Sequence, residues 1–511
     1  MKSLLGIDLG TSGLKAAVFG LDGTLLGLGR AANEYLPAPE GWAEQDPRKW
    51  WAGCCEAIRQ ALASAHVDAA GVAAIGVCGF HHCPVFLDAK GEPSRSTIVT
   101  HDRRLGRSLA ELEQSGILKK VVETSGSRVM TGHLPPIYHL VRTQDPAALD
   151  RTRWILLAKD YLRFRLTGKF GTELCDATGT NLIAMPEQDW SATLCSLLQV
   201  PRYKLPSIGR SSQIAGHVTS EAAVATGLEQ GTAVVYGGGD SHCALVGLGV
   251  TGSGQAGLLL GSNSTLRASF ASLVEPLDEM VWIQQHVLPG LYTASASSMA
   301  GSSVLAWFRE LCLGEGRHGA ATYLELESLA AGIPPGSDGL LFHPYLYGER
   351  SPFYNPEARG AFLGIRHWHG RGHFVRSIME GIAFAVANCF DAIQAIAGQR
   401  HEQLSLLRTG QSGGGRLPVW RQILTDVLGQ PIEVVQVEEP GCLGAALLAG
   451  VGAGQYADIQ TAIHQSVRVG SRISPDPEAR SYYAGRRRQF NETFHALEPI
   501  LYPQNTGEKV G

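Results

Sequence analysis

The chain has 511 residues, of which 44% are hydrophobic and 18% charged, and its formal net charge is −4 at pH 7. This length and composition predict a globular protein with two large domains and a ligand cleft at their junction. The weak negative charge excludes the basic surface of a nucleic-acid or anionic-membrane binder, and the sequence shows neither an apolar run of ~18 residues nor an uninterrupted signal core before Asp8.

The first predicted element is a strand over residues 4–8 that ends in the carboxylate of Asp8. A turn rich in glycine and hydroxyl groups follows at 9–13, and a second strand is predicted at 14–19. Backbone N–H and hydroxyl groups in such a turn can hold a phosphate beside Asp8. A hairpin with a polar tip is the alternative. Because the strand–Asp–x–Gly–Thr–strand pattern is the rarer arrangement, we favour a nucleotide role.

Asp46 as a cap and Pro47 in the first turn predict a helix over residues 47–64. A buried strand at 72–78 leads to the neighbouring histidines His81 and His82. Adjacent residues of a strand point to opposite faces, so the pair favours one hydrogen-bonding partner for a polar ligand over a metal site. A further strand at 97–99 precedes polar, ligand-type residues that include Asp102.

Residues 105–230 are mainly helical in pattern. Within them, 154–168 predicts a strand entering a helix that ends at Gly168, with its basic residues on a solvated face. A strand at 232–235 is followed by three glycines and then Asp240. Glycines allow a sharp turn and close approach, so an acid at the end of this buried strand is well placed to meet a ligand. A solvated Asp in an ordinary turn is the alternative.

The second half repeats the plan of the N-terminus. Residues 257–270 again predict strand, glycine-hydroxyl turn and strand, which indicates duplication of one domain plan with two such turns facing across a cleft. An apolar stripe over 374–393 predicts a core helix. After a strand at 404–407, the glycines 413–415 precede a helix at 418–428, where a flat ring or a phosphate can lie against the backbone. A small-residue helix from about residue 440 favours close packing.

Taken together, these stretches resemble the FGGY family of carbohydrate kinases, and within it most closely the xylulokinases. The similarity covers nearly the whole chain and keeps the family's order. It is carried by residues 6–12, 44–47 with Trp50 and Trp51, 159–162, 237–240, 345–352, 413–415 with 420–424, and 444–446.

The resemblance implies an α/β fold of two actin-like, ribonuclease H-like domains, here 1–247 for the sugar and catalytic base and 248–511 for the nucleotide. It implies ATP and Mg²⁺, with Asp240 as catalytic base and Asp8 as the magnesium residue. The remaining site residues that it implies fall into two groups. The sugar group comprises His81, His82, Asp102, Asp240 and Ser241, and the nucleotide group comprises Thr11, Ser12, Gly261, Ser262, Gly301, Gly413, Gly414 and Gly415.

Several residues depart from the xylulokinase pattern. Phe80, His81 and Cys83 replace Gln, Met and Gly, Thr100 and His101 replace Trp and Asn, and Ser241 replaces Asn. These changes lie where the sugar is expected, so they leave the substrate open. The second phosphate turn also differs but keeps a hydroxyl at Ser262.

We therefore expect an ATP-dependent sugar kinase acting on a hydroxyl of a small sugar, with a ketopentose such as D-xylulose as the first candidate. A kinase of another polyol or hydroxyketone, a sugar-binding regulator without transfer activity, and an ATP-driven clamp on the same fold are the alternatives. The ten cysteines show no Cys-x-x-Cys pair or zinc spacing, which predicts reduced thiols and a cytoplasmic location. The expected partners are the sugar and ATP, without nucleic acid or membrane, and a homodimer is left open.

Overall fold

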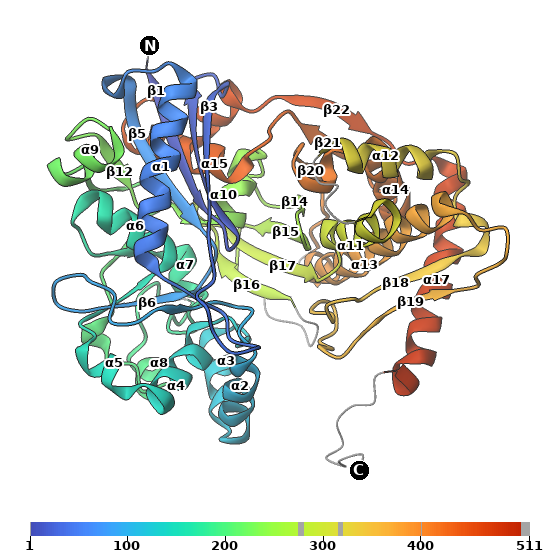
Figure 1. The fold of residues 1–511 in the computed structure, drawn as a ribbon, viewed down its shortest axis with the longest axis horizontal. Helices are drawn as coiled ribbons and strands as arrows, with labels where there is room; N and C mark the ends of the chain where they lie inside the picture. Colours follow the sequence, from blue (N-terminus) through green and yellow to red (C-terminus); the bar gives the residue numbers. More distant parts are fainter. Residues whose placement is uncertain (1, 186, 274–280, 315–319, 400, 502–511) are drawn as a thin grey trace.

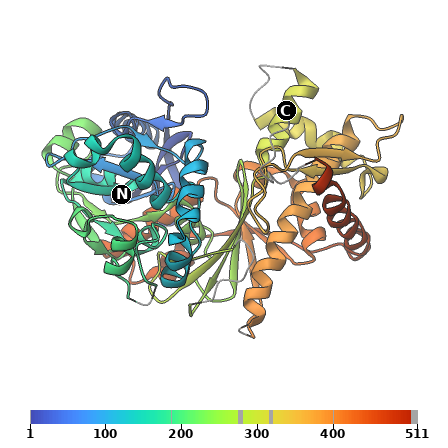
Figure 2. The ribbon, with the colours of Figure 1, turned by 90° about the horizontal axis from the view of Figure 1, so that it is seen from below.

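The computed structural model describes residues 2–185, 187–273, 281–314, 320–399 and 401–501. These residues form two α/β lobes that lie side by side, each built on a seven-stranded mixed sheet (Figures 1 and 2). The predicted two-domain α/β architecture is confirmed.

The first sheet forms the centre of the first lobe. Its strands run in the order β11 (Ile214–His217), β12 (Ala233–Val235), β5 (Val72–Gly79), β1 (Ser3–Leu9), β2 (Gly13–Gly20) and β3 (Leu25–Ala32), and β13 (Gly238–Gly239) pairs with β5. The strands predicted near the N-terminus, at 72–78 and at 232–235 are confirmed to within a residue at either end.

The second sheet repeats this plan. Its strands run in the order β16 (Trp282–Gln285), β17 (Tyr292–Ser298), β15 (Ser264–Phe270), β14 (Gln255–Leu260), β20 (Leu406–Thr409), β21 (Ile432–Val435) and β22 (Val469–Ile473). From β17 to β22 the succession of antiparallel and parallel pairs is the same as from β3 to β11. The predicted duplication is confirmed, and the β1–β2 and β14–β15 turns occupy equivalent places.

Two helices cover opposite faces of the first sheet. Leu5 and Ile7 pack in the cluster that contains α1 (Pro47–Ala65), whereas Leu4, whose side chain lies on the other face, packs in the cluster that contains α15 (Pro440–Gly452). A Cβ atom on Gly6 would lie 1.9 Å from the carbonyl oxygen of Cys442. The small-residue helix therefore returns from the C-terminal half to pack directly on β1 and β5, beside α10 (Asp240–Gly247), as Figure 1 shows.

The long helix α13 (Arg371–Gln399) forms the core of the second lobe. By length and composition alone it could cross a bilayer, but 72% of its most apolar stretch is buried inside the protein. It packs on β15 and β17, and Figure 2 shows those strands between α13 and the first lobe. The predicted apolar stripe is confirmed as the face of a core helix.

The remaining helices and short strands surround these two sheets. In the first lobe they are β4 (Glu44–Gln45), β6 (Pro84–Leu87), β7 (Thr97–Ile98), α2 (Arg104–Gln114), α3 (Ile117–Ser125), α4 (Leu134–Gln144), α5 (Pro146–Arg151), β8 (Trp154–Leu157), α6 (Ala158–Thr167), β9 (Thr172–Glu173), α7 (Leu174–Thr178), α8 (Ala192–Leu197), β10 (Ile208–Gly209) and α9 (Ser220–Thr226). From residue 302 onward they are α11 (Ser302–Leu313), α12 (Ala320–Ala331), β18 (Leu341–Pro344), β19 (Gly360–Leu363), α14 (Pro418–Leu428), α16 (Ile459–Ser466) and α17 (Pro477–Leu501).

Candidate active site

A polar cavity of about 260 Å³ lies where the two lobes meet. Five predicted site residues line it: Thr11, His81, His82, Asp240 and Ser241. The other lining residues are Phe80, Thr100, Met130, Thr131, Gly132, His133, Thr265, Arg267, Trp282, Gln284, Ser295, Ser297 and Arg350. Residues from both halves of the chain thus line one cavity, as is expected for a ligand cleft between two domains.

Asp240 is the first residue of α10, directly after the glycines of β13. A Cβ atom on Gly237 would lie 1.7 Å from the carbonyl oxygen of Val77, so the glycine lets the turn pass close to β5. The Asp240 side chain is 36% exposed toward the cavity, and its Oδ1 accepts the Ser241 N–H at 2.6 Å. Burial raises the pKa of Asp240, against the opposing effects of the Ser241 N–H and Arg267. A carboxylate of raised pKa facing a cavity can accept a proton from a bound hydroxyl.

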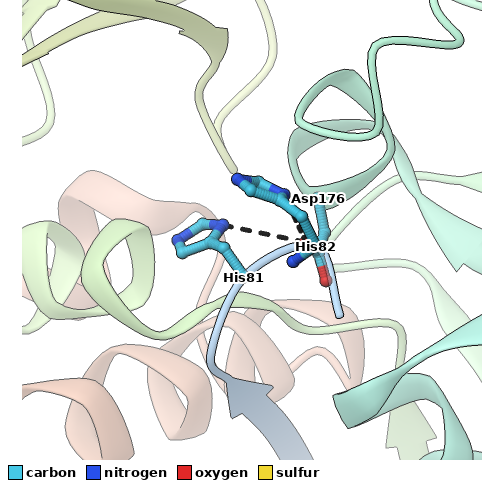
Figure 3. Close-up of side chains that lie close together, drawn as sticks. All are labelled: His81, His82 and Asp176. Atoms are coloured by element: carbon cyan, nitrogen blue, oxygen red, sulfur yellow. Dashed lines mark hydrogen bonds and ion pairs between the residues drawn. The ribbon is translucent and has the colours of Figure 1, made fainter. Parts of the chain in front are cut away.

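His81 and His82 both point toward Asp176 of α7, as Figure 3 shows. Nδ1 of His82 lies 3.1 Å from Asp176 Oδ1 and Nδ1 of His81 lies 3.7 Å from it. The expectation that adjacent histidines face opposite ways is wrong, because both lie in a turn beyond the end of β5 and His82 has φ of 65°. Gly179 and Gly239 make room for the rings, since a Cβ there would lie 1.7 and 1.8 Å from His82 and His81.

His82 links the two lobes through its ring nitrogens. Burial lowers its pKa, so the ring is neutral near pH 7. Its Nδ1–H donates to Asp176, and its Nε2 accepts from the Gln284 amide of β16 at 3.0 Å. The spacing of His81, His82 and Asp176 could also hold a metal ion. The Lys159 ammonium, 3.6 Å from Asp176 Oδ2, opposes a further cation, so we retain the hydrogen-bonding interpretation.

Lys159 and Arg163 of α6 are fully buried, which corrects the prediction of a solvated basic face. The Lys159 ammonium lies 2.8 Å from Asp160, 3.4 Å from Glu173 and 3.6 Å from Asp176. Burial alone would lower the pKa of Lys159, but these carboxylates outweigh it and raise the pKa above its usual value. The prediction failed because the carboxylates that neutralise Lys159 come partly from β9 and α7, which follow later in the chain.

Replacing Lys159 with Met is expected to lower the free energy of unfolding by about 3–5 kcal/mol, because three buried carboxylates lose their shared cation. Urea denaturation of the purified variant measures the change. The matched control is Lys169→Met, since Lys169 is exposed, and its effect should stay within about 0.5 kcal/mol. A Lys159→Met protein as stable as the control would contradict a structural role for the buried ion cluster.

Asp8 lies near the end of β1, and its Oδ1 is buried without a hydrogen-bond partner among the described residues. Burial and then the Asp240 carboxylate raise the pKa of Asp8 to about 6, against the lowering effect of Lys15. A Cβ atom on Gly441 would lie 3.0 Å from Asp8 Oδ2, so the glycine keeps space beside the carboxylate. A carboxylate with one oxygen left without a hydrogen-bond partner and with free space beside it fits a hard divalent cation such as Mg²⁺.

The first phosphate-type turn is held by residues of a motif whose role the sequence did not reveal. Gln45 donates through Nε2 to the carbonyl oxygen of Thr11 at 2.9 Å, and its Oε1 accepts from Trp50 Nε1 at 2.8 Å. Asn33 donates to the carbonyl oxygen of Gly10 at 2.7 Å. Thr11 is half-buried on the cavity wall and Ser12 is exposed. Gln45 of the Glu-Gln-Asp-Pro stretch and Asn33 thus fix the turn from outside.

The second turn, at Gly261 and Ser262, is exposed and rests on the start of α11. The N–H groups of Ser302 and Ser303 donate to the carbonyl oxygens of Gly261 and Ser262 at 2.9 and 3.2 Å. A Cβ atom on Gly301 would lie 2.4 Å from the Ser262 carbonyl oxygen, so the glycine permits this contact. Gly301 does not line the polar cavity.

A second, mostly apolar cavity of about 470 Å³ opens beside this turn. Gly413 and Gly414 line it, and Gly415 lies behind them, where a Cβ would be 2.2 Å from the carbonyl oxygen of Gly410. The other lining residues are Ser302, Leu305, Tyr323, Leu324, Arg416, Leu417 and Trp420. Apolar side chains next to bare glycine backbone suit a flat aromatic ring such as a purine.

Asp102 does not line the polar cavity. Its carboxylate is buried and accepts from the Ala43 N–H at 2.8 Å and from Arg104 at 2.6 Å. Those contacts are to Oδ2, and Oδ1 accepts from the backbone N–H and Nε–H of Arg104, each at 2.9 Å. Both oxygens are therefore engaged within the first lobe, where they fix the loop before α2. Sequence reasoning also missed several polar residues of the site, among them Asp176, Arg267, Gln284 and His242. The only signal for the last of these was its place two residues after Asp240.

Comparison with known proteins agrees with this geometry. The N-terminal domain model of the FGGY family of carbohydrate kinases matches residues 3–247, and the C-terminal domain model matches residues 257–453. The xylulose kinase of Escherichia coli K12 is 31% identical over 97% of this chain and 99% of that protein. The autoinducer-2 kinase of Enterobacter sp. 638 is 28% identical over 97% of this chain and 94% of that protein.

Among solved structures, the xylulose kinase from Rhodospirillum rubrum superposes with a TM-score of 0.86 at 27% identity, covering 98% of this chain and 100% of that one. The matched family models together cover most of the chain and include both cavities. This chain therefore belongs to the FGGY family of carbohydrate kinases and is a xylulokinase-like member of it.

Proposed function

We propose that this protein transfers the γ-phosphoryl group of ATP to a hydroxyl of a small sugar bound in the polar cavity. A ketopentose is the first candidate for the acceptor. The observation that carries the proposal is the position of Asp240, whose carboxylate faces the cavity together with Thr11 of the first glycine-hydroxyl turn. Family membership supplies the reaction class, and the apolar cavity beside Gly413 and Gly414 supplies a place for the adenine ring.

In the proposed reaction Asp240 accepts the proton of the sugar hydroxyl as its oxygen attacks the γ-phosphorus. A new oxygen–phosphorus bond forms, the bond from the γ-phosphorus to the bridging oxygen breaks, and ADP leaves with that oxygen. Phosphoryl transfer requires mainly alignment and charge neutralisation. The turns at Gly10–Ser12 and Gly261–Ser262 would orient the phosphates with backbone donors, and Asp8 would hold Mg²⁺. When bound, the ion would neutralise charge on the phosphates.

The acceptor is the open part of the proposal. Relatives at similar identity are named for different substrates, xylulose and autoinducer-2. In this chain His81, Thr100 and Ser241 line the cavity at positions where the xylulokinase pattern has other side chains. His81 Nε2 lies 3.0 Å from Ser241 Oγ and 3.3 Å from Asp240 Oδ1, so these substitutions directly adjoin the proposed base.

D-xylulose is therefore expected to be a weaker acceptor than some other small polyhydroxylated compound. Polar groups of a site that are left unpaired by a substrate can cost several powers of ten in kcat/KM. A coupled ADP-release assay over ketoses, alditols and small hydroxyketones measures the ranking. A panel in which D-xylulose gives by far the highest kcat/KM would refute this expectation while leaving the sugar-kinase proposal intact.

Two further parts of the proposal concern the whole molecule. Ten free cysteines, nine of them buried, suit a reducing compartment, and we propose a cytoplasmic location. The bounds 1–247 and 248–511 remain our proposed division into a sugar domain and a nucleotide domain. A homodimer remains open, and sedimentation of the purified protein would decide it.

A further inference from the structure

The wall of the polar cavity contains a buried guanidinium without a carboxylate partner. Arg267 of β15 is 6% exposed. The Asp240 carboxylate acts on its charge from a distance, but among the described residues no carboxylate lies within ion-pair distance of Arg267. Its Nη1 lies 2.6 Å from His242 Nε2 and 3.1 Å from Gln284 Oε1, both neutral groups. Its Nε is buried without any acceptor in the described parts of the chain.

A buried guanidinium without an ion-pair partner destabilises the protein when no ligand is bound. Buried charges are normally paired, because moving an ion out of water is repaid only by an opposite charge and good hydrogen bonds. Burial lowers the pKa of Arg267 to about 10, so the group remains charged at neutral pH. The nearby histidines contribute no charge to the site, because burial lowers the pKa of His81, His82 and His242 and leaves these rings neutral.

The charges lining the cavity leave a positive excess. Arg267 and Arg350 both line it, and Asp240 is the carboxylate among its lining residues. The Arg350 side chain makes no ion pair among the described residues, although the charge of its neighbour Glu349 acts on it. Glu349 itself accepts from Ser298 Oγ at 2.6 Å and from the N–H groups of Met299 and Arg350 at 2.8 and 2.7 Å. A ligand with one negative charge would bring the summed charge of Arg267, Arg350 and Asp240 to zero.

Arg267 belongs to the acceptor side of the cavity. Thr265 and Arg267 point to the same face of β15, and Arg267 is two residues, about 7 Å, farther from the Gly261–Ser262 turn. Its direct neighbours are Gln284 and His242, and Gln284 in turn contacts His82. The Arg267 guanidinium thus contacts Gln284, the hydrogen-bond partner of the proposed sugar-binding residue His82, rather than the proposed phosphate-binding turns.

We infer that the preferred acceptor of this site is a small polyhydroxy carboxylate, a sugar acid whose carboxylate is bound by Arg267 with Arg350 nearby. This inference rests on the proposed kinase function and names its substrate class. A carboxylate suits the site better than a phosphate ester, because a planar monoanion matches the guanidinium fork and the single excess charge. The transferred phosphoryl group still goes to a hydroxyl of the acid, whose proton goes to Asp240.

The test compares acids with their neutral counterparts in the wild-type protein. The coupled ADP-release assay is run with erythronate and erythritol, arabinonate and arabinitol, and gluconate and glucitol, with D-xylulose and glycerol 3-phosphate as further probes. We expect at least one acid to exceed its alditol in kcat/KM by about tenfold or more, since a site built around a charged group rejects analogues that leave it unpaired. Alditols equal to or better than every acid would overturn the inference, as would a preference for glycerol 3-phosphate over the carboxylates.

The same ratio is then measured in variants. In Arg267→Gln the acid-to-alditol ratio of kcat/KM should fall about 10²-fold, and Arg267→Lys should recover part of it. The matched control is Arg107→Gln, which removes one positive charge from an exposed site on α2 and should leave the ratio unchanged. An unchanged ratio in Arg267→Gln would overturn the assignment of Arg267. If that variant does not fold, as judged by its Tm, the wild-type ratio decides alone.

Failure of the inference can be told apart from failure of the proposed function. ADP release with neutral sugars but not with acids would overturn the inference and leave the kinase proposal standing. Calorimetric binding of a sugar acid without any acceptor-dependent ADP release would support the acid site and contradict the kinase proposal.

Discussion

Replacing Asp240 with Asn is expected to lower kcat by about 10²–10⁴-fold, the usual contribution of a general base. The amide keeps the size of the carboxylate and can still accept the Ser241 N–H, which lies 2.6 Å from Oδ1. It cannot take the proton of a sugar hydroxyl. ATP affinity should change little, because the proposed nucleotide contacts come from the glycine turns and the apolar cavity. Calorimetry measures the affinity, and acceptor-dependent ADP release measures kcat.

The matched control is Asp150→Asn, which removes a carboxylate from an exposed position of α5. It should retain wild-type kcat. Turnover of Asp240→Asn within about tenfold of wild type would mean that another residue accepts the proton. The Asp240 assignment would then be wrong.

Replacing Asp8 with Asn is expected to lower kcat by about 10²-fold or more at low Mg²⁺, because charge stabilisation by a bound metal is worth several kcal/mol. The buried carboxylate, whose pKa is raised to about 6 by burial and by Asp240, is the group we expect to hold the ion. Unlike the Asp240 defect, this defect should be relieved in part by raising Mg²⁺. A titration of kcat against Mg²⁺ for both variants separates the two roles.

The Asp8 test has a second readout that does not depend on turnover. Calorimetry with Mg²⁺ and a non-hydrolysable ATP analogue should show weaker metal-dependent nucleotide binding in Asp8→Asn than in Asp240→Asn. Equal Mg²⁺ dependence in wild type and Asp8→Asn would contradict the metal assignment.

Local patterns predicted most of the backbone framework. The cap at Asp46, the helix stop at Gly168 and the strand before Asp240 are set by nearby residues, and the structure confirms each of them. The duplicated strand–turn–strand pattern predicted the repeated sheet because both copies face the same local demands. Two glycines also mark a long-range contact: at Gly6 and Gly76 helix α15 packs so close to the strand backbone that a Cβ atom would not fit.

The polar contacts of the site could not be predicted in this way. Lys159 was expected in solvent because its partners Glu173 and Asp176 belong to elements that come later in the chain. Arg267 and Gln284 lie in the second half of the chain but contact His242 and His82 of the first. A pairing between lobes leaves no spacing signal in a single sequence. The turn that brings His81 and His82 together was missed for a local reason, the left-handed backbone at His82.

The most direct test of the central claim is ADP release by the purified protein with ATP and Mg²⁺, in the presence and absence of each acceptor, with mass spectrometry of the product. We predict that at least one small polyhydroxylated acceptor raises ADP release well above the rate without acceptor and gains the mass of one phosphoryl group. The same acceptor should fail to do so with Asp240→Asn. ADP release that no acceptor changes, or acceptor phosphorylation that persists in Asp240→Asn, would contradict the proposed function of this site.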